Sequence, residues 1–312
     1  MNILVKLAAI RRLSGLSQTA LAGKLDVSFV SLNRWLHGKA VPRKHAQERI
    51  DALYREYTGL KEIPEEELEA KKTMLARKAR RKKNVLKTIL ENTDIRDQFT
   101  LILTYTSNSI EGSTLTEAQT AIILFQNTTL PDKTLVEQLE AKNHQAALLY
   151  LFDHLAKKKN INEDLVLKLH GMLMNGIRQD AGAYRHHAIR IVGADLPTEN
   201  YLKVPDLMAR LAKDFQKTGG DIMTWTANIH ARFEQIHPFS DGNGRIGRLL
   251  IHAMLLYGNW PPAVIRSQQK ARYYAYLNKA QRSDDSSLLQ DFLCDAVLNG
   301  WDILERRRLR SR

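Results

Sequence analysis

The chain has 312 residues, of which 44% are hydrophobic and 26% charged, and its formal net charge is +13. This length exceeds that of one small domain and predicts two domains. No run of about 18 residues is apolar and uncharged, which excludes a membrane-spanning helix. The single cysteine, Cys294, excludes an internal disulfide and a structural zinc site, and it is typical of a cytoplasmic protein.

The positive charge is concentrated at the N-terminal end. Residues 1–83 contain 19 Lys and Arg against 9 Asp and Glu. Such a basic module favours phosphate-rich partners such as nucleic acid, although a solvated basic surface without a ligand explains the charge equally well. The first residues, MNILVKLAAIRRLSG, have arginines where a signal peptide would have its cleavage site, and they predict a first helix.

Short helices are predicted over residues 3–57, with a helix-turn-helix within them. Ser28 is the predicted N-cap of the second helix of this motif, and Gly38 is predicted to end it. The apolar spacing assigns an inward face to Leu21, Ala22, Leu25, Leu32 and Trp35.

The segment Gln18–Pro42 resembles DNA-binding domains of the lambda-repressor/Cro type. The resemblance implies a recognition helix from Ser28 to Leu36. It also implies DNA contacts by Ser31, Asn33 and Arg34. Phe29 and Val30 depart from the family pattern, because apolar side chains offer no hydrogen bonds to bases. A helical docking module is the alternative interpretation.

Residues 61–84 are charge-dense, with acidic residues ahead of basic ones at helical spacing, and they predict an exposed linker helix. The β-branched stretch 188–193 predicts a small β-hairpin. Apolar periodicity predicts further helices at 85–103, 116–126, 134–156, 162–176, 204–217, 223–236, 244–257, 270–281 and 287–305. The predicted fold is therefore mainly α with one hairpin, divided into residues 1–60, 61–84 and 85–305.

Residues 237–248 read HPFSDGNGRIGR, and an apolar run follows, so a helix is predicted to begin near Asn243. A glycine-rich turn that opens a helix directs backbone N–H groups at an anion such as phosphate. His237 suits a general base because the pKa of an imidazole lies near neutrality. Asp241 suits Mg²⁺, whose other ligands are phosphate oxygens and water. Arg245 and Arg248 share a helix face and suit phosphate oxygens.

This stretch resembles the signature of Fic proteins, His-Pro-Phe-x-Asp/Glu-Gly-Asn-Gly-Arg-x-x-Arg, at every specified position. The resemblance implies a helical Fic core and a protein adenylyltransferase, which moves AMP from ATP to a Tyr, Thr or Ser hydroxyl of a target protein. It implies that His237 is the catalytic base and that Asp241 binds Mg²⁺. The implied ATP site consists of Gly242, Asn243, Gly244, Arg245, Ile246, Gly247 and Arg248.

Three further segments extend the resemblance to about residues 85–300. Ser107, Glu111 and Gly112 match an inhibitory motif of the family, on a helix around residues 104–112, in which Glu111 would withhold Arg248 from the γ-phosphate of ATP. A flap that holds the target peptide as an added strand is implied at Arg190, Ile191, Val192 and Gly193. Tyr273 and Tyr274 would lie near the nucleotide base, or else in the core.

Other interpretations remain open. His230, Glu234 and His237 have the spacing of three metal ligands on one helix face. The Fic site would also serve to remove AMP or to transfer another group. From a different class, the chain would be a DNA-binding regulator whose Fic core senses nucleotide or modifies the regulator itself. The predicted partners are ATP, a target protein and, through the N-terminal domain, DNA; a homodimer is also considered.

Overall fold

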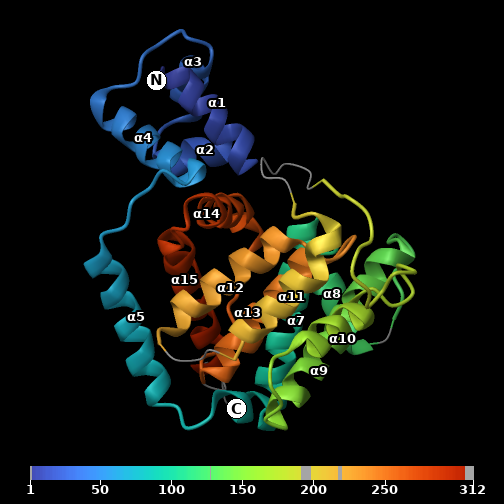
Figure 1. Ribbon diagram of the computed structural model, residues 1–312. Coiled ribbons are helices and arrows are strands. Elements are labelled where there is room, and N and C mark those ends of the chain that lie inside the picture. The colour runs from blue at the N-terminus through green and yellow to red at the C-terminus, as the bar shows by residue number, and fades with distance from the viewer. Residues whose placement is uncertain (1, 127, 191–197, 217–219, 306–312) are drawn as a thin grey trace, which may run out of the picture. The chain divides into compact units, whose positions relative to one another are not determined.

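The computed structural model describes residues 2–126, 128–190, 198–216 and 220–305 (Figure 1). Over these residues the chain forms fifteen α-helices, two short 3₁₀ helices and no β-strand. The predicted mainly α fold is therefore confirmed. No helix in this part of the chain is long and apolar enough to cross a membrane.

Two compact units make up the chain: Met1–Pro64 with Gln268–Leu289, and Glu65–Ser267 with Gln290–Arg312. The division into domains 1–60 and 85–305 stays a prediction. The two compact units differ from these domains at two places. Residues 65–84 group with the larger unit, and residues 268–289 group with the N-terminal one. The second difference has a local cause, because the helix at 270–283 packs against two N-terminal helices.

The first unit contains a helix-turn-helix. Its helices are α1 (Ile3–Ser14), α2 (Gln18–Leu25), α3 (Phe29–Leu36), α4 (Lys44–Thr58) and α14 (Lys270–Ser283), with the 3₁₀ helix η2 (Ser267–Gln269) at its boundary. α1 and α14 both pack against α4, while α2 packs against α3. The predicted inward face is buried, with Leu32 fully inaccessible and Trp35 8% exposed.

The turn between α2 and α3 has the predicted capping. Asp26 adopts a left-handed conformation after α2, and Ser28 Oγ accepts the backbone N–H of Ser31 at 3.1 Å. The Ser31 hydroxyl, predicted to contact DNA, lies 2.9 Å from that of Ser28. Phe29 and Val30 are 46% and 65% exposed, so α3 presents apolar side chains at its start.

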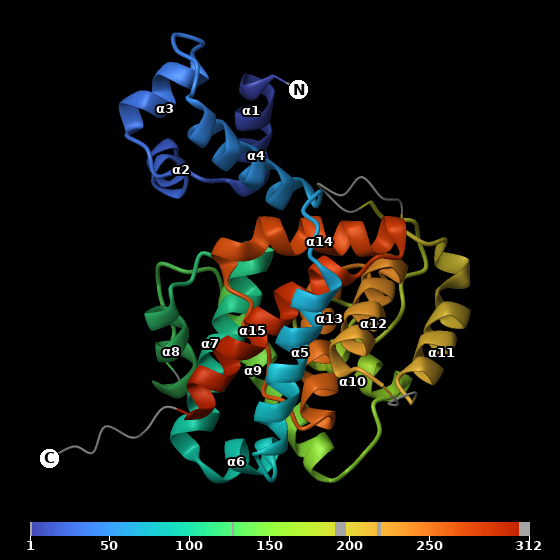
Figure 2. The same cartoon turned by 90° about the vertical axis from the view of Figure 1, so that its left-hand side faces the viewer.

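The larger unit holds α5 (Glu65–Arg80) against α15 (Ser287–Glu305), as Figure 2 shows. Lys71 Nζ contacts Asp291 at 2.6 Å, and Lys72 Nζ contacts Asp221 at 2.6 Å. Leu68, Lys72, Leu75 and Ala79 form a buried stripe along α5. The predicted helix is therefore present, but it is not exposed on all sides, because it has a mostly apolar stripe within its charged sequence. Its role as a linker stays a prediction.

One predicted helix, 85–103, is two helices: α6 (Val85–Glu91) and α7 (Thr93–Glu111). Asn92 ends the first in an extended conformation and caps the second, since its Oδ1 accepts the Ile95 N–H at 3.3 Å. α7 then runs on to Glu111 and ends at Gly112, whose φ is +107°. This extension brings the Ser107–Gly112 segment onto one continuous helix.

The larger unit also contains α13 (Asn243–Tyr257) and several helices that precede it in the chain. They are α8 (Glu117–Gln126), α9 (Leu135–Ala156), α10 (Glu163–Leu173), the 3₁₀ helix η1 (Tyr201–Lys203), α11 (Val204–Asp214) and α12 (Ile222–Ile236). α13 packs against α7, α9, α10 and α12, and its side chains are buried along almost its whole length. A helix that is enclosed on all sides holds its N-terminus in a fixed place, and that N-terminus carries the HPFSDGNGR segment.

Candidate active site

His237 ends α12 as its C-cap residue, with a left-handed backbone (φ 51°, ψ 62°). Its side chain is only 16% exposed. The Nδ1–H of the imidazole donates a hydrogen bond to the Glu234 carbonyl at 3.2 Å, because a carbonyl can only accept. Nε2 therefore carries the lone pair. Burial is the main cause that lowers the pKa of His237 to about 4, so the ring is a neutral base at pH 7.

Two buried side chains that the sequence did not single out hold the loop around His237. Arg185 Nε donates to the His237 carbonyl at 2.7 Å, and the Arg185 N–H donates to the Pro238 carbonyl at 2.9 Å. His170, on α10, stacks on Phe239 and donates from Nε2 to the Asp241 carbonyl at 3.1 Å. Because both partners of each contact are distant in sequence, only the fold reveals them.

The start of α13 has the geometry of an anion site. Gly242 is its N-cap, with φ of +79° and no side-chain capping hydrogen bond, so the first N–H groups of the helix have no capping side chain. Asn243 fixes the turn instead, since its Oδ1 accepts the Phe239 N–H at 2.8 Å and its Nδ2 donates to the Phe239 carbonyl at 2.7 Å. Glycine is favoured at 242 because of this positive φ, and a Cβ there would also force the end of the Met174 side chain to shift.

Asp241 precedes this turn, and its side chain is 53% exposed. Its Oδ1 accepts the Gly242 N–H at 2.6 Å and lies 3.5 Å from Arg245 NH2. In the described part of the chain no three His, Cys, Asp or Glu side chains gather as a metal site. One exposed carboxylate fits Mg²⁺ that is held mainly by nucleotide phosphates and water.

The alternative metal site at His230, Glu234 and His237 is not formed within the described residues. His230 is buried, and its ring lies over Gly247 of α13. His237 leaves the helix in a left-handed conformation. The helical spacing of the three residues is therefore broken at the third, and the sequence-based alternative was wrong.

The two arginines of the signature are both buried and contact different helices. Arg245 NH1 lies 2.5 Å from Glu140 of α9. Arg248 NH2 contacts Glu111 Oε1 at 2.6 Å and the Ser107 carbonyl at 3.0 Å, while Arg248 Nε donates to Ser107 Oγ at 3.0 Å. The Arg248–Glu111 contact implied by the resemblance is thus present. Glu140 was not anticipated, since nothing in its sequence neighbourhood marks it.

The other residues of the predicted ATP site have varied surroundings. Ile246 is fully buried in the apolar core, and Gly247 faces Glu234 and His230. Tyr273 and Tyr274 belong to α14 of the first unit, where their ring centroids are 5.2 Å apart. Their contact with a nucleotide remains a prediction.

The predicted flap is not seen as a β-hairpin. Arg190 is exposed and has no strand conformation, while Ile191, Val192 and Gly193 lie outside the described residues. The two ends of the segment meet, since Thr198 Oγ1 donates to the Ile189 carbonyl at 3.0 Å. The role of this segment in holding a target peptide stays a prediction.

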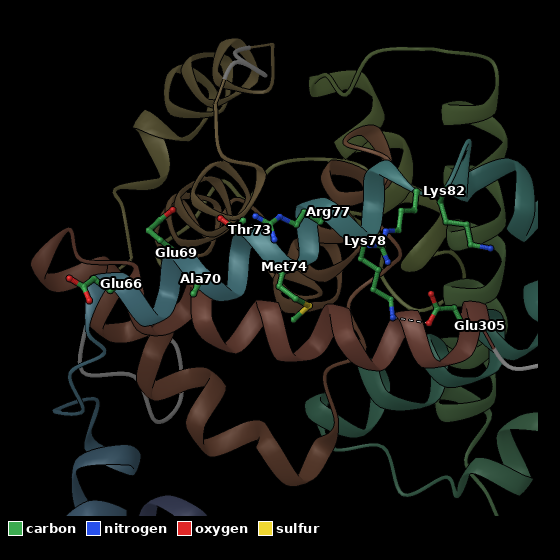
Figure 3. A pocket seen from close by; sticks show the side chains of 10 residues that line it. Glu66, Glu69, Ala70, Thr73, Met74, Arg77, Lys78, Lys82 and Glu305 are labelled. Atoms are coloured by element: carbon green, nitrogen blue, oxygen red, sulfur yellow. Dashed lines mark hydrogen bonds and ion pairs between the residues drawn. The ribbon is translucent and has the colours of Figure 1, made fainter.

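A groove of about 750 Å³ runs along α5 (Figure 3). Arg77, Lys78 and Lys82 lie toward one end of it, and Glu66 and Glu69 toward the other. None of its lining residues belongs to the signature. His237 and the glycine-rich turn lie at the junction of α12 and α13 and not in this groove, so we place the candidate active site at that junction.

These observations define a helical protein with a neutral imidazole beside an open helix N-terminus. Residues 160–255 match the Fic/DOC family, and residues 5–59 match a helix-turn-helix domain. The chain therefore carries a Fic/DOC domain and an N-terminal helix-turn-helix domain.

Curated relatives and a solved structure agree with this assignment. The protein adenylyltransferase Fic of Nematostella vectensis is 30% identical over 196 residues, which is 58% of this chain and 43% of that protein. The protein of the same name from Drosophila erecta is 32% identical over 207 residues, covering 64% and 40%. The chain thus spans less than half the length of these relatives. Fic-1 from C. elegans has a TM-score of 0.64 at 20% identity, with 97% of each chain covered, and shows the shared fold.

Proposed function

We propose that this protein is an adenylyltransferase that moves AMP from ATP to a hydroxyl of a target protein. The single observation that carries the proposal is the neutral His237 imidazole, with Nε2 as its basic nitrogen, beside the uncapped start of α13. The names of the curated relatives support the choice of AMP as the transferred group. The general class of reaction, transfer of a nucleotide, is inferred from the signature at residues 237–248.

In the proposed reaction, Nε2 of His237 takes the proton of a Tyr, Thr or Ser hydroxyl. The hydroxyl oxygen forms a bond to the α-phosphorus, the bond from that phosphorus to the bridging oxygen breaks, and pyrophosphate leaves. The proton on His237 then passes to water. A positioned imidazole typically accelerates such a step by roughly 100- to 10,000-fold.

The other residues bind and orient the nucleotide. The first N–H groups of α13 and the Arg245 guanidinium would contact phosphate oxygens, and Arg248 would hold the γ-phosphate. Asp241 would hold Mg²⁺, which neutralises phosphate charge when it is bound. Arg185 and His170 keep the loop in place through their contacts with the His237 and Asp241 carbonyls.

Glu111 is proposed to restrain this reaction. Its carboxylate contacts Arg248 at 2.6 Å, and a Cβ on Gly244 would collide with the same carboxylate. Glu111 therefore lies over the first turn of α13, where it both occupies the guanidinium and adds a negative charge beside the proposed phosphate site. A carboxylate and a phosphate compete for one guanidinium.

Transfer from ATP labelled at different phosphates tests the reaction type. The intact protein is incubated with Mg²⁺ and with α-labelled or γ-labelled ATP, and its mass is measured. We expect the added mass of AMP with either donor, but label on the protein only from α-labelled ATP. Label from γ-labelled ATP, or modification only with another donor, would contradict AMP transfer. A protein that only removes AMP from a modified target would take up neither label.

DNA binding is a second candidate function of the first unit. It is favoured by the match of residues 5–59 to a helix-turn-helix domain and by the excess of basic residues before residue 84. Asn33 and Arg34 are on the proposed recognition helix α3. The exposed side chains of Phe29 and Val30 cannot form hydrogen bonds to bases. We therefore expect contacts with DNA phosphates to supply most of the binding free energy.

A gel-shift titration at two salt concentrations tests this function. We expect binding of duplex DNA that weakens log-linearly with salt, because phosphate contacts release counterions. Arg34→Ala should weaken binding and lower the salt slope, whereas Arg96→Ala in the larger unit should leave both unchanged. Equal binding by wild type and Arg34→Ala would remove α3 from the DNA contact.

A further inference from the structure

Two carboxylates lie over successive turns of α13. A Cβ on Gly244 would collide with Glu111 Oε1, and a Cβ on Gly247 would collide with Glu234 Oε1. Positions three apart share one face of a helix. Glu111 comes from α7 and Glu234 from α12, so two helices bring acidic side chains to the same face of α13.

Glu234 is the more deeply buried of the two, with 6% of the residue exposed. Among the described residues its ion-pair contact is with His237, where Oε2 lies 3.7 Å from Nδ1, and Oε1 has no hydrogen-bond partner. Arg248 attracts the ionised form of Glu234, but Arg248 already contacts Glu111, which repels it. His230, also near Gly247, is buried, and burial lowers its pKa to about 3, so it adds no positive charge.

Burial, with the charge of Glu111, raises the pKa of Glu234 to about 8. Loss of hydration on burial is the larger cause, and the Glu111 carboxylate adds to it, because a second negative charge is costly in a desolvated site. At neutral pH Glu234 therefore holds a proton while Glu111 pairs with Arg248. If Glu111 is removed, a negative charge is lost and the pKa of Glu234 must fall.

His237 is sensitive to this change. When Nε2 accepts a proton, the ring becomes an imidazolium, and Arg185 disfavours that charge while Asp241 and Glu111 favour it. A carboxylate at 3.7 Å from Nδ1 would stabilise the imidazolium, whereas a protonated acid would not.

We propose that Glu234 is a positioning residue that links the Arg248–Glu111 pair to the charge state of His237. With Glu111 in contact with Arg248, Glu234 stays protonated and gives the imidazolium no counter-ion. When Glu111 leaves, Glu234 ionises, faces Arg248 and supports the proton that His237 takes. Glu111 thus acts on the base as well as on the phosphate site. This inference rests on the proposed function of His237 as that base.

A nucleotide-free measurement tests the link directly. Glutamate side-chain carboxyl carbons of the full-length protein are followed by NMR as pH changes, and the Glu234 signal is identified by its loss in Glu234→Gln. In Glu111→Gly the ionisation midpoint of Glu234 should be about one pH unit lower than in the wild type, since a nearby negative charge is lost. Asp153→Asn, which loses an exposed carboxylate, should behave as the wild type.

Kinetics provide the second readout. Glu111→Gly should gain rate as pH rises through the ionisation of Glu234, at a midpoint below that of the wild type. Glu111→Gly/Glu234→Gln should lose this limb and about tenfold in kcat, as one pKa unit of imidazolium stabilisation corresponds to tenfold, with KM for ATP unchanged. Equal Glu234 midpoints with and without Glu111 overturn the inference. Absence of AMP transfer in every variant would overturn the proposed function instead. The NMR comparison needs no AMP transfer and still tests the link between Glu111 and Glu234.

Discussion

Replacing Glu111 by glycine is expected to raise the rate of AMP transfer about 100-fold, which corresponds to ~2.7 kcal/mol. In the structure Glu111 Oε1 contacts Arg248 NH2 at 2.6 Å, and Arg248 is almost fully buried. Removing the carboxylate frees a buried guanidinium that still donates to Ser107 and cannot leave the site. The γ-phosphate of ATP is the anion expected to take the vacated place.

The measurement is the initial rate of label transfer from α-labelled ATP, for wild type and Glu111→Gly at equal concentration. Glu117→Gly serves as the control, because it removes an exposed glutamate from the first turn of α8 and should leave the rate unchanged. An unaltered rate in Glu111→Gly would end the regulatory proposal but leave the catalytic one standing.

Replacing His237 by alanine is expected to abolish AMP transfer, with a loss of at least about 100-fold. The reason is the geometry at the end of α12. Nδ1 is occupied by the Glu234 carbonyl at 3.2 Å, and Nε2 is the basic nitrogen of a ring whose pKa lies near 4. No alanine side chain takes a proton, so the hydroxyl would attack without a base.

The loss is best measured in the Glu111→Gly background, where the rate is highest. ATP binding, followed by calorimetry, should persist in His237→Ala, because the start of α13 and both arginines are intact. His45→Ala, at a histidine whose side chain is 77% exposed, should keep full activity. Transfer that survives in His237→Ala within tenfold of its parent would assign the base to another group.

Much of the site was predictable because its residues are adjacent in sequence. His237, Asp241 and the Gly-Asn-Gly turn stand within a short stretch, and an apolar run after it predicts the helix that orients the turn. The local signals at Ser28 and Gly38 likewise predicted a cap and a helix end, since capping depends on neighbours a few residues away. The recognition of Glu111 and of its partner Arg248 came from a motif, and the packing of α7 on α13 brings the two side chains together.

The amino-acid sequence by itself determined the helical class, the helix-turn-helix and the identity of the signature residues, because periodicity, caps and short motifs are local. Only the tertiary structure decided which distant groups complete the site: Glu140 on Arg245 and Arg185 on the His237 carbonyl. It also decided that α5 is packed and that residues 85–103 form parts of two helices. The physical reason is that burial and desolvation depend on what the whole chain brings together, and these set the charge of His237 and Glu234.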